Sequence, residues 1–131
     1  MFRRPLARVA VVDHAYRVLL LHVREGRSLW WELPLGPAVP DALAEAGVAR
    51  GARVGPCVWA HGRERTYVAW LDDPLAPRAE PVVRSAVLGE RWWTLDELAS
   101  SDETFRPARL PALMPALVRG EYGAAPVDCG A

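Results

Sequence analysis

One segment, from Trp30 to Trp59, constrains the fold more than any other part of the chain. It opens with apolar residues typical of a strand, which Pro34 closes because proline cannot continue a hydrogen-bonded ladder. A short helical run over residues 41–46 follows, and Gly47 ends it, since glycine readily adopts the left-handed cap of a helix. A second strand begins near Val54. The segment therefore predicts a strand–loop–helix–strand unit.

Apolar runs predict further strands on both sides of this unit. A helix is expected after the last strand, because Thr94 and Glu97 have the spacing of a capping box. Another helix is expected over residues 107–118, where leucine and methionine recur at helical spacing. The expected strands cover residues 6–12, 17–23, 54–61, 65–71 and 87–93, and a proline- and alanine-rich loop covers residues 72–84.

Length and charge limit the class of protein. A chain of 131 residues suits one domain, expected over residues 1–120, with a flexible C-terminal tail over residues 121–131. Lys plus Arg residues number 16 and balance 16 Asp plus Glu residues, so no net field attracts nucleic acid. No apolar run reaches the ~18 residues of a membrane-spanning helix. We therefore expect a cytoplasmic protein that binds neither nucleic acid nor a membrane.

Several motifs resemble the Nudix hydrolase superfamily. VVDHAYRVLLLHVREG resembles the opening hairpin of Nudix domains, and ERWWTLDEL resembles their last strand and the start of the next helix. Pro34-Leu35-Gly36 and Glu45-Ala46-Gly47-Val48 resemble the two ends of the Nudix box, G-x5-E-x7-R-E-U-x-E-E-x-G-U, where U is bulky and aliphatic. Gly36 and Gly47 lie 11 positions apart, roughly ten fewer than in that pattern. The resemblance implies an α/β (α+β) fold, a Nudix α/β/α sandwich with a central mixed sheet and a truncated, degenerate box helix.

The resemblance also implies a metal site that is reduced in this chain. Nudix hydrolases hold Mg²⁺ or Mn²⁺ with box carboxylates, and the metal activates the attacking water. Aligned backwards from Gly47, only Asp41 and Glu45 remain as carboxylates. A helix would place both on one face, where they could hold a weakly bound Mg²⁺ or Mn²⁺. Asp41 could instead cap the free N–H groups at the helix start. We expect no cofactor, with weak metal binding at these two residues as the alternative.

Three side chains are candidates for acid–base catalysis in the expected cleft. His61 lies at a strand end, and histidine in general titrates near neutral pH. Glu90 lies on the last strand, where the resemblance implies that a glutamate contributes to metal binding or acts as a base. Glu32 lies between two apolar residues at the mouth of the cleft. The alternative for each is an ordinary exposed polar residue.

Six further residues are candidates for binding a substrate: His22, Trp31, Trp59, Arg63, Arg65 and Trp92. The tryptophan rings could form a flat apolar wall of the cleft, or they could supply core area. The two arginines flank a hairpin tip, where they could hold a phosphate or a carboxylate, or stay solvated. Alternation along residues 54–61 predicts that Val58 and Trp59 lie on opposite faces of their strand.

These features leave three interpretations of function. The expected one is a Nudix-fold protein that has lost metal-dependent pyrophosphohydrolase chemistry and acts on a small molecule, for instance in biosynthesis, by metal-independent acid–base catalysis. The first alternative is a non-catalytic ligand-binding or regulatory protein. The second alternative is a residual Nudix hydrolase of a nucleoside-diphosphate-type substrate. A small molecule in the cleft is the expected partner, and the shortened helix could expose apolar surface for a homodimer.

Overall fold

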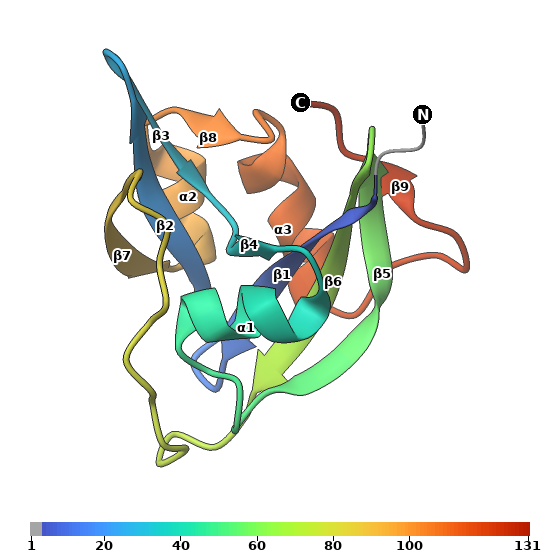
Figure 1. The fold of residues 1–131 in the computed structure, drawn as a ribbon. Helices are drawn as coiled ribbons and strands as arrows, with labels where there is room; N and C mark the ends of the chain where they lie inside the picture. Colours follow the sequence, from blue (N-terminus) through green and yellow to red (C-terminus); the bar gives the residue numbers. More distant parts are fainter. Residues whose placement is uncertain (1–3) are drawn as a thin grey trace.

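A computed structural model describes residues 4–131, so the first three residues of the predicted domain lie outside the described part. Nine strands and three helices form within this range (Figure 1). The strands are β1 (Leu6–Asp13), β2 (Val18–Glu25), β3 (Ser28–Glu32), β4 (Leu35–Gly36), β5 (Arg53–His61), β6 (Glu64–Leu71), β7 (Val87–Trp93), β8 (Phe105–Arg106) and β9 (Val127–Asp128). The helices are α1 (Val39–Ala46), α2 (Leu95–Ser100) and α3 (Leu110–Val118). No helix of residues 4–131 has the length and apolar content that crossing a membrane requires.

The strands form a mixed sheet in the order β8-β3-β2-β1-β6-β5-β9, with β4 paired to β1 and β7 paired to β2. β1 lies parallel to β6 along its whole length, from Leu6 opposite Glu64 onwards. β1 meets β2 only where Val12 faces Val18, so the two strands diverge from that point. Because β3 pairs with β2 on the diverging side, β3 and the start of β1 are separated, and side chains from both can turn into the space between them.

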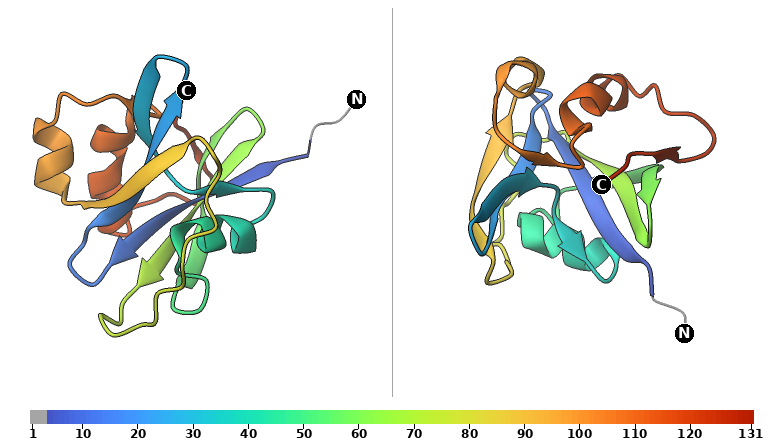
Figure 2. Two further views of the ribbon diagram at one scale, coloured as in Figure 1. Left: turned by 60° about the vertical axis from the view of Figure 1, so that its left-hand side comes forward. Right: turned by 90° about the horizontal axis from the view of Figure 1, so that it is seen from above.

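Helices cover both faces of the sheet, with α1 on one face and α2 and α3 on the other (Figure 2). Of the two cores that contact helices, the smaller joins α1 to Val9, Val11 and Leu19. The larger core includes Met114 of α3 and Trp93 of β7. Each fully buried apolar side chain of this size stabilises the fold by about 1.5–3 kcal/mol. The expected α/β/α sandwich around a mixed sheet is confirmed.

Contacts at both ends limit helix α1 to eight residues. At its start, Ala38 is the N-cap residue, and Asp41, the third residue of the helix, accepts the Ala38 backbone N–H at 3.1 Å, which is the reciprocal bond of a capping box. At its end, Gly47 has a φ of 71°, and its N–H donates to the Ala44 carbonyl at 3.0 Å. Gly36 of β4 lies so close to the helix that a β-carbon there would stand 2.5 Å from that of Asp41. The short helix is therefore tightly seated against β4.

The expected alternation along β5 is wrong. The ladder between β5 and β6 shifts register between Val54 and Cys57 and again between Cys57 and Trp59, as in a β-bulge. As a result, Val58 and Trp59 both lie in the larger core, with 2% and 4% of their surface exposed.

The segment over residues 72–86 contains turns but no helix or strand, and it is held against the end of α1. Three hydrogen bonds hold it there. Ala79 N donates to Gly47 O at 3.0 Å, Val82 N donates to Ala44 O at 3.1 Å, and Arg78 Nη2 donates to Ala46 O at 2.9 Å. These bonds satisfy carbonyl groups that a helix C-terminus leaves free. The segment therefore reaches β7 along a defined path, which brings Arg84 beside α1 and β3.

Residues 121–131, expected as a flexible tail, run back along the edge of the sheet. β9 pairs in parallel with β5, where Val127 lies opposite Trp59. The N–H of Cys129 donates to the carbonyl of Ala60 at 3.2 Å, and the Cys129 side chain is buried. This segment therefore forms part of the wall of the site described next.

Candidate functional site

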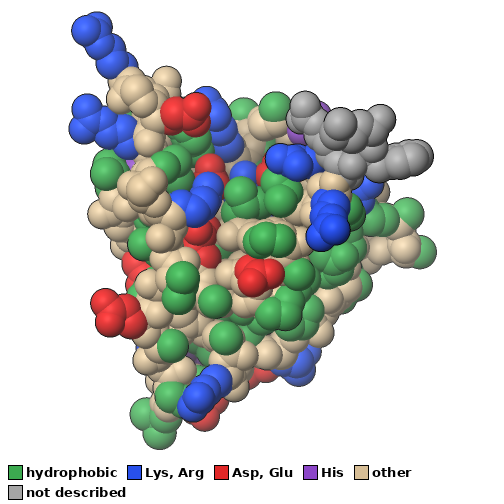
Figure 3. Space-filling view, in the orientation of Figure 1, with side chains coloured by type: hydrophobic (Ala, Val, Ile, Leu, Met, Phe, Trp, Pro, Cys, Tyr) green, Lys and Arg blue, Asp and Glu red, His purple; other side chains and the backbone are tan. Residues whose placement is uncertain are grey.

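A cavity of about 360 Å³ lies where β3 diverges from β1 and β6. Its lining comes from five strands, from the end of the segment over residues 72–86, from the residues around β8 and from the C-terminal segment: Arg8, Val23, Glu25, Trp30, Glu32, His61, Glu64, Thr66, Arg84, Ala86, Arg106, Pro107, Cys129, Gly130 and Ala131. Acidic and basic side chains are interspersed on this side of the molecule, above α1 (Figure 3). The volume is at the lower end of the about 300–1,000 Å³ found for small-molecule sites. The cavity is therefore the candidate functional site.

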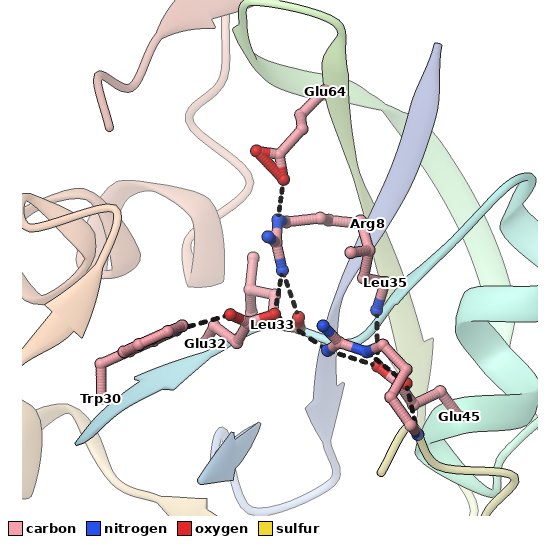
Figure 4. Close-up of polar contacts among 8 residues, drawn as sticks. Arg8, Trp30, Glu32, Leu33, Leu35, Glu45 and Glu64 are labelled. Carbon is pink, nitrogen blue, oxygen red and sulfur yellow. Dashed lines mark hydrogen bonds and ion pairs between the residues drawn. The ribbon is translucent and has the colours of Figure 1, made fainter. Parts of the chain in front are cut away.

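Glu32 of β3 is the most enclosed charge of the cavity, with 4% of its side chain exposed. Its Oε2 accepts Arg8 Nη1 at 2.7 Å, and its Oε1 accepts Trp30 Nε1 at 2.6 Å. Burial raises the pKa of this carboxyl group, but Arg8 and the hydrogen bonds outweigh burial and hold the pKa below its ordinary value of 4.5. Arg8 also pairs with Glu64, and Figure 4 shows Arg8 between the two glutamates. Glu32 is therefore held as an anion, with both oxygens engaged.

Glu45 of α1 is equally buried, with 3% of its side chain exposed, and it is paired with Arg84. Arg84 Nε and Nη2 donate to the two oxygens of Glu45 at 2.8 and 2.9 Å, and the Leu35 N–H adds a third bond at 2.9 Å. The same Nη2 donates to Oε2 of Glu32 at 2.9 Å. Burial lowers the pKa of Arg84, but its bonds to Glu45 and Glu32 outweigh burial and raise it. One guanidinium group therefore bridges two buried carboxylates from different elements. Figure 4 labels the two carboxylates, Glu32 of β3 and Glu45 of α1.

This arrangement does not fit a divalent metal ion. Within residues 4–131, no group of three or more His, Cys, Asp or Glu side chains could hold a metal. The carboxylate of Asp41 is engaged at the start of α1, and those of Glu32 and Glu45 are engaged by arginine. A Mg²⁺ or Mn²⁺ ion needs several oxygen ligands, so it would have to displace Arg84 to reach this pair.

His61 and Asp128 form a pair at the rim of the cavity. Nδ1 of His61 lies 3.2 Å from Oδ1 of Asp128, so Asp128 contacts Nδ1 of the ring and not Nε2. The hydrogen bond from the backbone N–H of Gly130 is the main cause that lowers the pKa of Asp128, and the bond to His61 is the second. This carboxylate therefore stays charged. Burial raises the pKa of the Cys129 thiol next to it, which makes Cys129 a poor nucleophile. The pair therefore offers one oriented imidazole that can accept a proton.

Trp30 and Arg106 form a stacked pair on another part of the rim. The guanidinium carbon of Arg106 lies 3.6 Å from the ring centroid of Trp30. Trp30 is buried, whereas Arg106 is exposed. Such stacking holds a cation without neutralising its charge. Arg106 makes no ion pair within residues 4–131, in contrast to Arg8 and Arg84.

The expected catalytic residues are divided between two places. His61 and Glu32 line the same cavity. Glu90 lies on the exposed side of β7, where its carboxylate is 3.4 Å from Nη2 of Arg78. Trp92 of the same strand lies near that arginine, whose guanidinium carbon is 5.4 Å from its ring centroid. Neither β7 residue lines the cavity.

The other expected binding residues lie outside the cavity as well. Trp31 packs edge-on against Trp93 in the larger core and stacks on His22 with ring centroids 4.2 Å apart. Trp59 belongs to the same core. Arg63 is exposed at the hairpin tip, and Arg65 donates to the carbonyl of Gly62 at 2.8 Å in that turn. The structure therefore gives these residues positions in the core or in a turn.

Four residues that shape the cavity are not among the candidates that the sequence predicts: Arg8, Glu64, Arg84 and Arg106. Arg8 had a usable signal, because it is a single charge inside an apolar strand and such a charge needs a partner when buried. Arg84 lies in a proline-rich loop and Arg106 follows a polar one, and arginine is normally solvated at such positions. Only the paths of those loops in three dimensions bring them to the cavity.

No family model matches the sequence, and no curated protein matches it. Solved structures do match the fold over most of the chain. RenU, a Nudix hydrolase from M. smegmatis, gives a TM-score of 0.63 at 20% identity, covering 90% of this chain and 85% of its own. An Ap4A hydrolase from C. elegans gives 0.61 at 13% identity, covering 88% and 98%. The NUDIX domain of Shewanella oneidensis NrtR, solved with ADP ribose, gives 0.56 at 17% identity, covering 86% of each chain. The chain therefore has the Nudix fold.

Proposed function

We propose that the chain binds a small ligand with an acidic group in this cavity, and that it does so without a divalent metal ion. Arg106 is the observation that carries the proposal, because it is an exposed cation stacked on Trp30 at the cavity rim. A guanidinium group recognises carboxylate and phosphate groups through two parallel hydrogen bonds. The buried Trp30 ring holds this guanidinium group in place at the rim. The ADP ribose bound to the NrtR domain supports acidic ligands as a class for this fold.

The charges of the cavity separate into engaged and available groups. Arg8 is engaged by Glu32 and Glu64, and Arg84 is engaged by Glu32 and Glu45. Removing either arginine from its partner would leave a buried charge without compensation. Arg106 and His61 are therefore the groups that can contact a ligand without disrupting the network.

A binding test with and without chelator addresses the proposal. The panel consists of inorganic phosphate, pyrophosphate, AMP and ADP-ribose, measured by thermal melting and calorimetry in EDTA and again in Mg²⁺. At least one member should raise the melting temperature equally in both buffers. Arg106→Ala should weaken its binding at least about tenfold, the loss expected for a charge-assisted hydrogen bond. Arg27→Ala, at an exposed site outside the cavity, is the matched control and should bind as the wild type does.

Two results would contradict the proposal. One is that no member of the panel shifts the melting temperature. The other is that binding requires Mg²⁺ or Mn²⁺. Phosphate release with either metal would favour a Nudix hydrolase instead.

The His61–Asp128 pair favours a second candidate function, acid–base catalysis on the bound ligand without a metal. An imidazole held at Nδ1 by a carboxylate presents Nε2 to a substrate proton. Glu32 is unsuited to this role, since arginine and tryptophan donors engage both of its oxygens. For a ligand that is turned over, His61→Ala should abolish turnover and weaken binding much less than Arg106→Ala does, and Asp128→Asn should reduce turnover. Unchanged turnover in His61→Ala would exclude this candidate.

A further inference from the structure

Two carboxylates in this fold are almost fully buried and face one shared cation. Glu32 belongs to β3 and Glu45 to α1, and their side chains are 4% and 3% exposed. Buried carboxylates are strongly disfavoured unless positive charge and hydrogen bonds compensate them. This chain must therefore supply compensation at this point between the sheet and α1.

Arg84 supplies the charge that both carboxylates share. Its Nε and Nη2 reach the two oxygens of Glu45, and Nη2 also reaches Oε2 of Glu32. Other donors complete the bonds to both carboxylates. The Leu35 N–H donates to Glu45, whereas Arg8 and Trp30 donate to Glu32. Every carboxylate oxygen of the pair is thus satisfied by the chain itself.

The position of Arg84 is fixed by the segment that carries it. Arg84 lies near the end of the segment over residues 72–86. Earlier in that segment, the backbone N–H groups of Ala79 and Val82 donate to carbonyl groups at the end of α1. Glu45 belongs to the same helix. Tethering a cation this close to its anions gives it a high effective concentration, against which a free ion in solution must compete.

We infer that Arg84 is an internal cation that takes the place of a divalent ion between Glu32 and Glu45 and excludes such an ion from them. The chain then keeps this carboxylate pair for structure, and the pair becomes a cation site only when Arg84 is removed. The inference concerns the pair alone and stands whichever ligand the cavity binds.

The test measures Mn²⁺ binding to purified variants by the electron paramagnetic resonance signal of free Mn²⁺, together with thermal melting. Arg84→Met should bind one Mn²⁺ with a Kd on the order of 1 mM, as expected for a site of few carboxylates. Saturating Mn²⁺ should raise its melting temperature by about 4 °C. The wild type should bind at least about tenfold more weakly and melt unchanged. Arg53→Met is the control, because it removes an arginine from the exposed pair with Asp72.

Two further variants keep the inference open to refutation if Arg84→Met does not fold. Arg84→Lys retains a cation and should fold without acquiring Mn²⁺ binding. Arg84→Met/Glu45→Gln leaves one carboxylate for Arg8 to compensate, so it should be more stable than Arg84→Met and should bind no Mn²⁺. Folded Arg84→Met without Mn²⁺ binding would overturn the inference. It would also be overturned by wild-type Mn²⁺ binding that Glu45→Gln removes, or by a double variant no more stable than Arg84→Met. None of these outcomes depends on the ligand panel.

Discussion

Nε of Arg84 lies 2.8 Å from Oε2 of Glu45, although 39 positions of the chain separate the two residues. This pair joins the irregular segment before β7 to the buried side of α1. Loss of the Arg84–Glu45 pair therefore weakens the attachment of this segment to α1, in addition to removing one ion pair.

Glu45→Gln should destabilise the protein by about 2 kcal/mol. Loss of one partner from a fully buried ion pair costs about 3–5 kcal/mol, and the value is reduced here because Arg84 is about one-third exposed. Denaturant unfolding measures the change. Asp72→Asn, which breaks the exposed pair with Arg53, is the control and should cost less than about 1 kcal/mol. Equal losses in the two variants would show that burial of the Arg84–Glu45 pair is unimportant.

Glu32 should make stability depend on pH in the acid range. Its pKa in the folded protein lies below the ordinary value of 4.5, so the unfolded chain binds the additional proton first as the pH falls. The contribution of Glu32 is complete above about pH 4.5 and is lost as the pH falls through the lowered pKa.

Unfolding experiments at a series of pH values below neutrality compare the wild type with Glu32→Gln. The free energy of unfolding of the wild type should rise with pH more steeply than that of the variant in the window just below pH 4.5. Glu103→Gln, at an exposed position, should retain the wild-type slope. Parallel curves for wild type and Glu32→Gln would contradict the assignment of this slope to Glu32.

Gly36→Ala should destabilise the contact between β4 and α1 by about 1–3 kcal/mol, the usual cost of overpacking. The added β-carbon would stand 2.5 Å from Cβ of Asp41 and 2.7 Å from the backbone nitrogen of Ala42. Thermal unfolding is the measurement. Gly89→Ala is the matched control, since a β-carbon there meets no atom within 4 Å and an alanine in a strand costs less backbone entropy. A variant as stable as the control would mean that α1 can shift freely.

The sequence predicts the parts of this structure that depend on neighbouring residues. The strands follow from apolar runs, and the capping box at Thr94 and Glu97 forms as its spacing indicates. The paired shift in β5 could not be predicted, because a bulge depends on how β5 meets β6 and leaves no clear local pattern. The Arg84 bridge was missed for the same reason, since its bond to Glu32 spans 52 positions.

The site could be predicted only in part. The sequence predicts His61 and Glu32 as candidates, at a strand end and at the mouth of a cleft, and both line the cavity. Arg106 reaches the rim only because β8 pairs with β3, an association between distant short segments. Short apolar or polar segments carry little information about such pairing, whereas long strands carry much.

Arg78→Ala should loosen the segment that carries Arg84. Arg78 donates to the carbonyl groups of Ala46 and Gly47 at 2.9 and 3.3 Å, so its removal frees two acceptors at the end of α1. Local opening exposes a segment to protease in proportion to the open population. Trypsin should therefore cleave after Arg84 about three- to tenfold faster in the variant, a factor that corresponds to the net loss of about one hydrogen bond. Arg50→Ala, at an exposed position after α1, should leave the rate unchanged. If Arg78→Ala is cleaved no faster than wild type, the two Arg78 bonds contribute nothing to the placement of Arg84, which the backbone bonds of Ala79 and Val82 and the two glutamates must then hold.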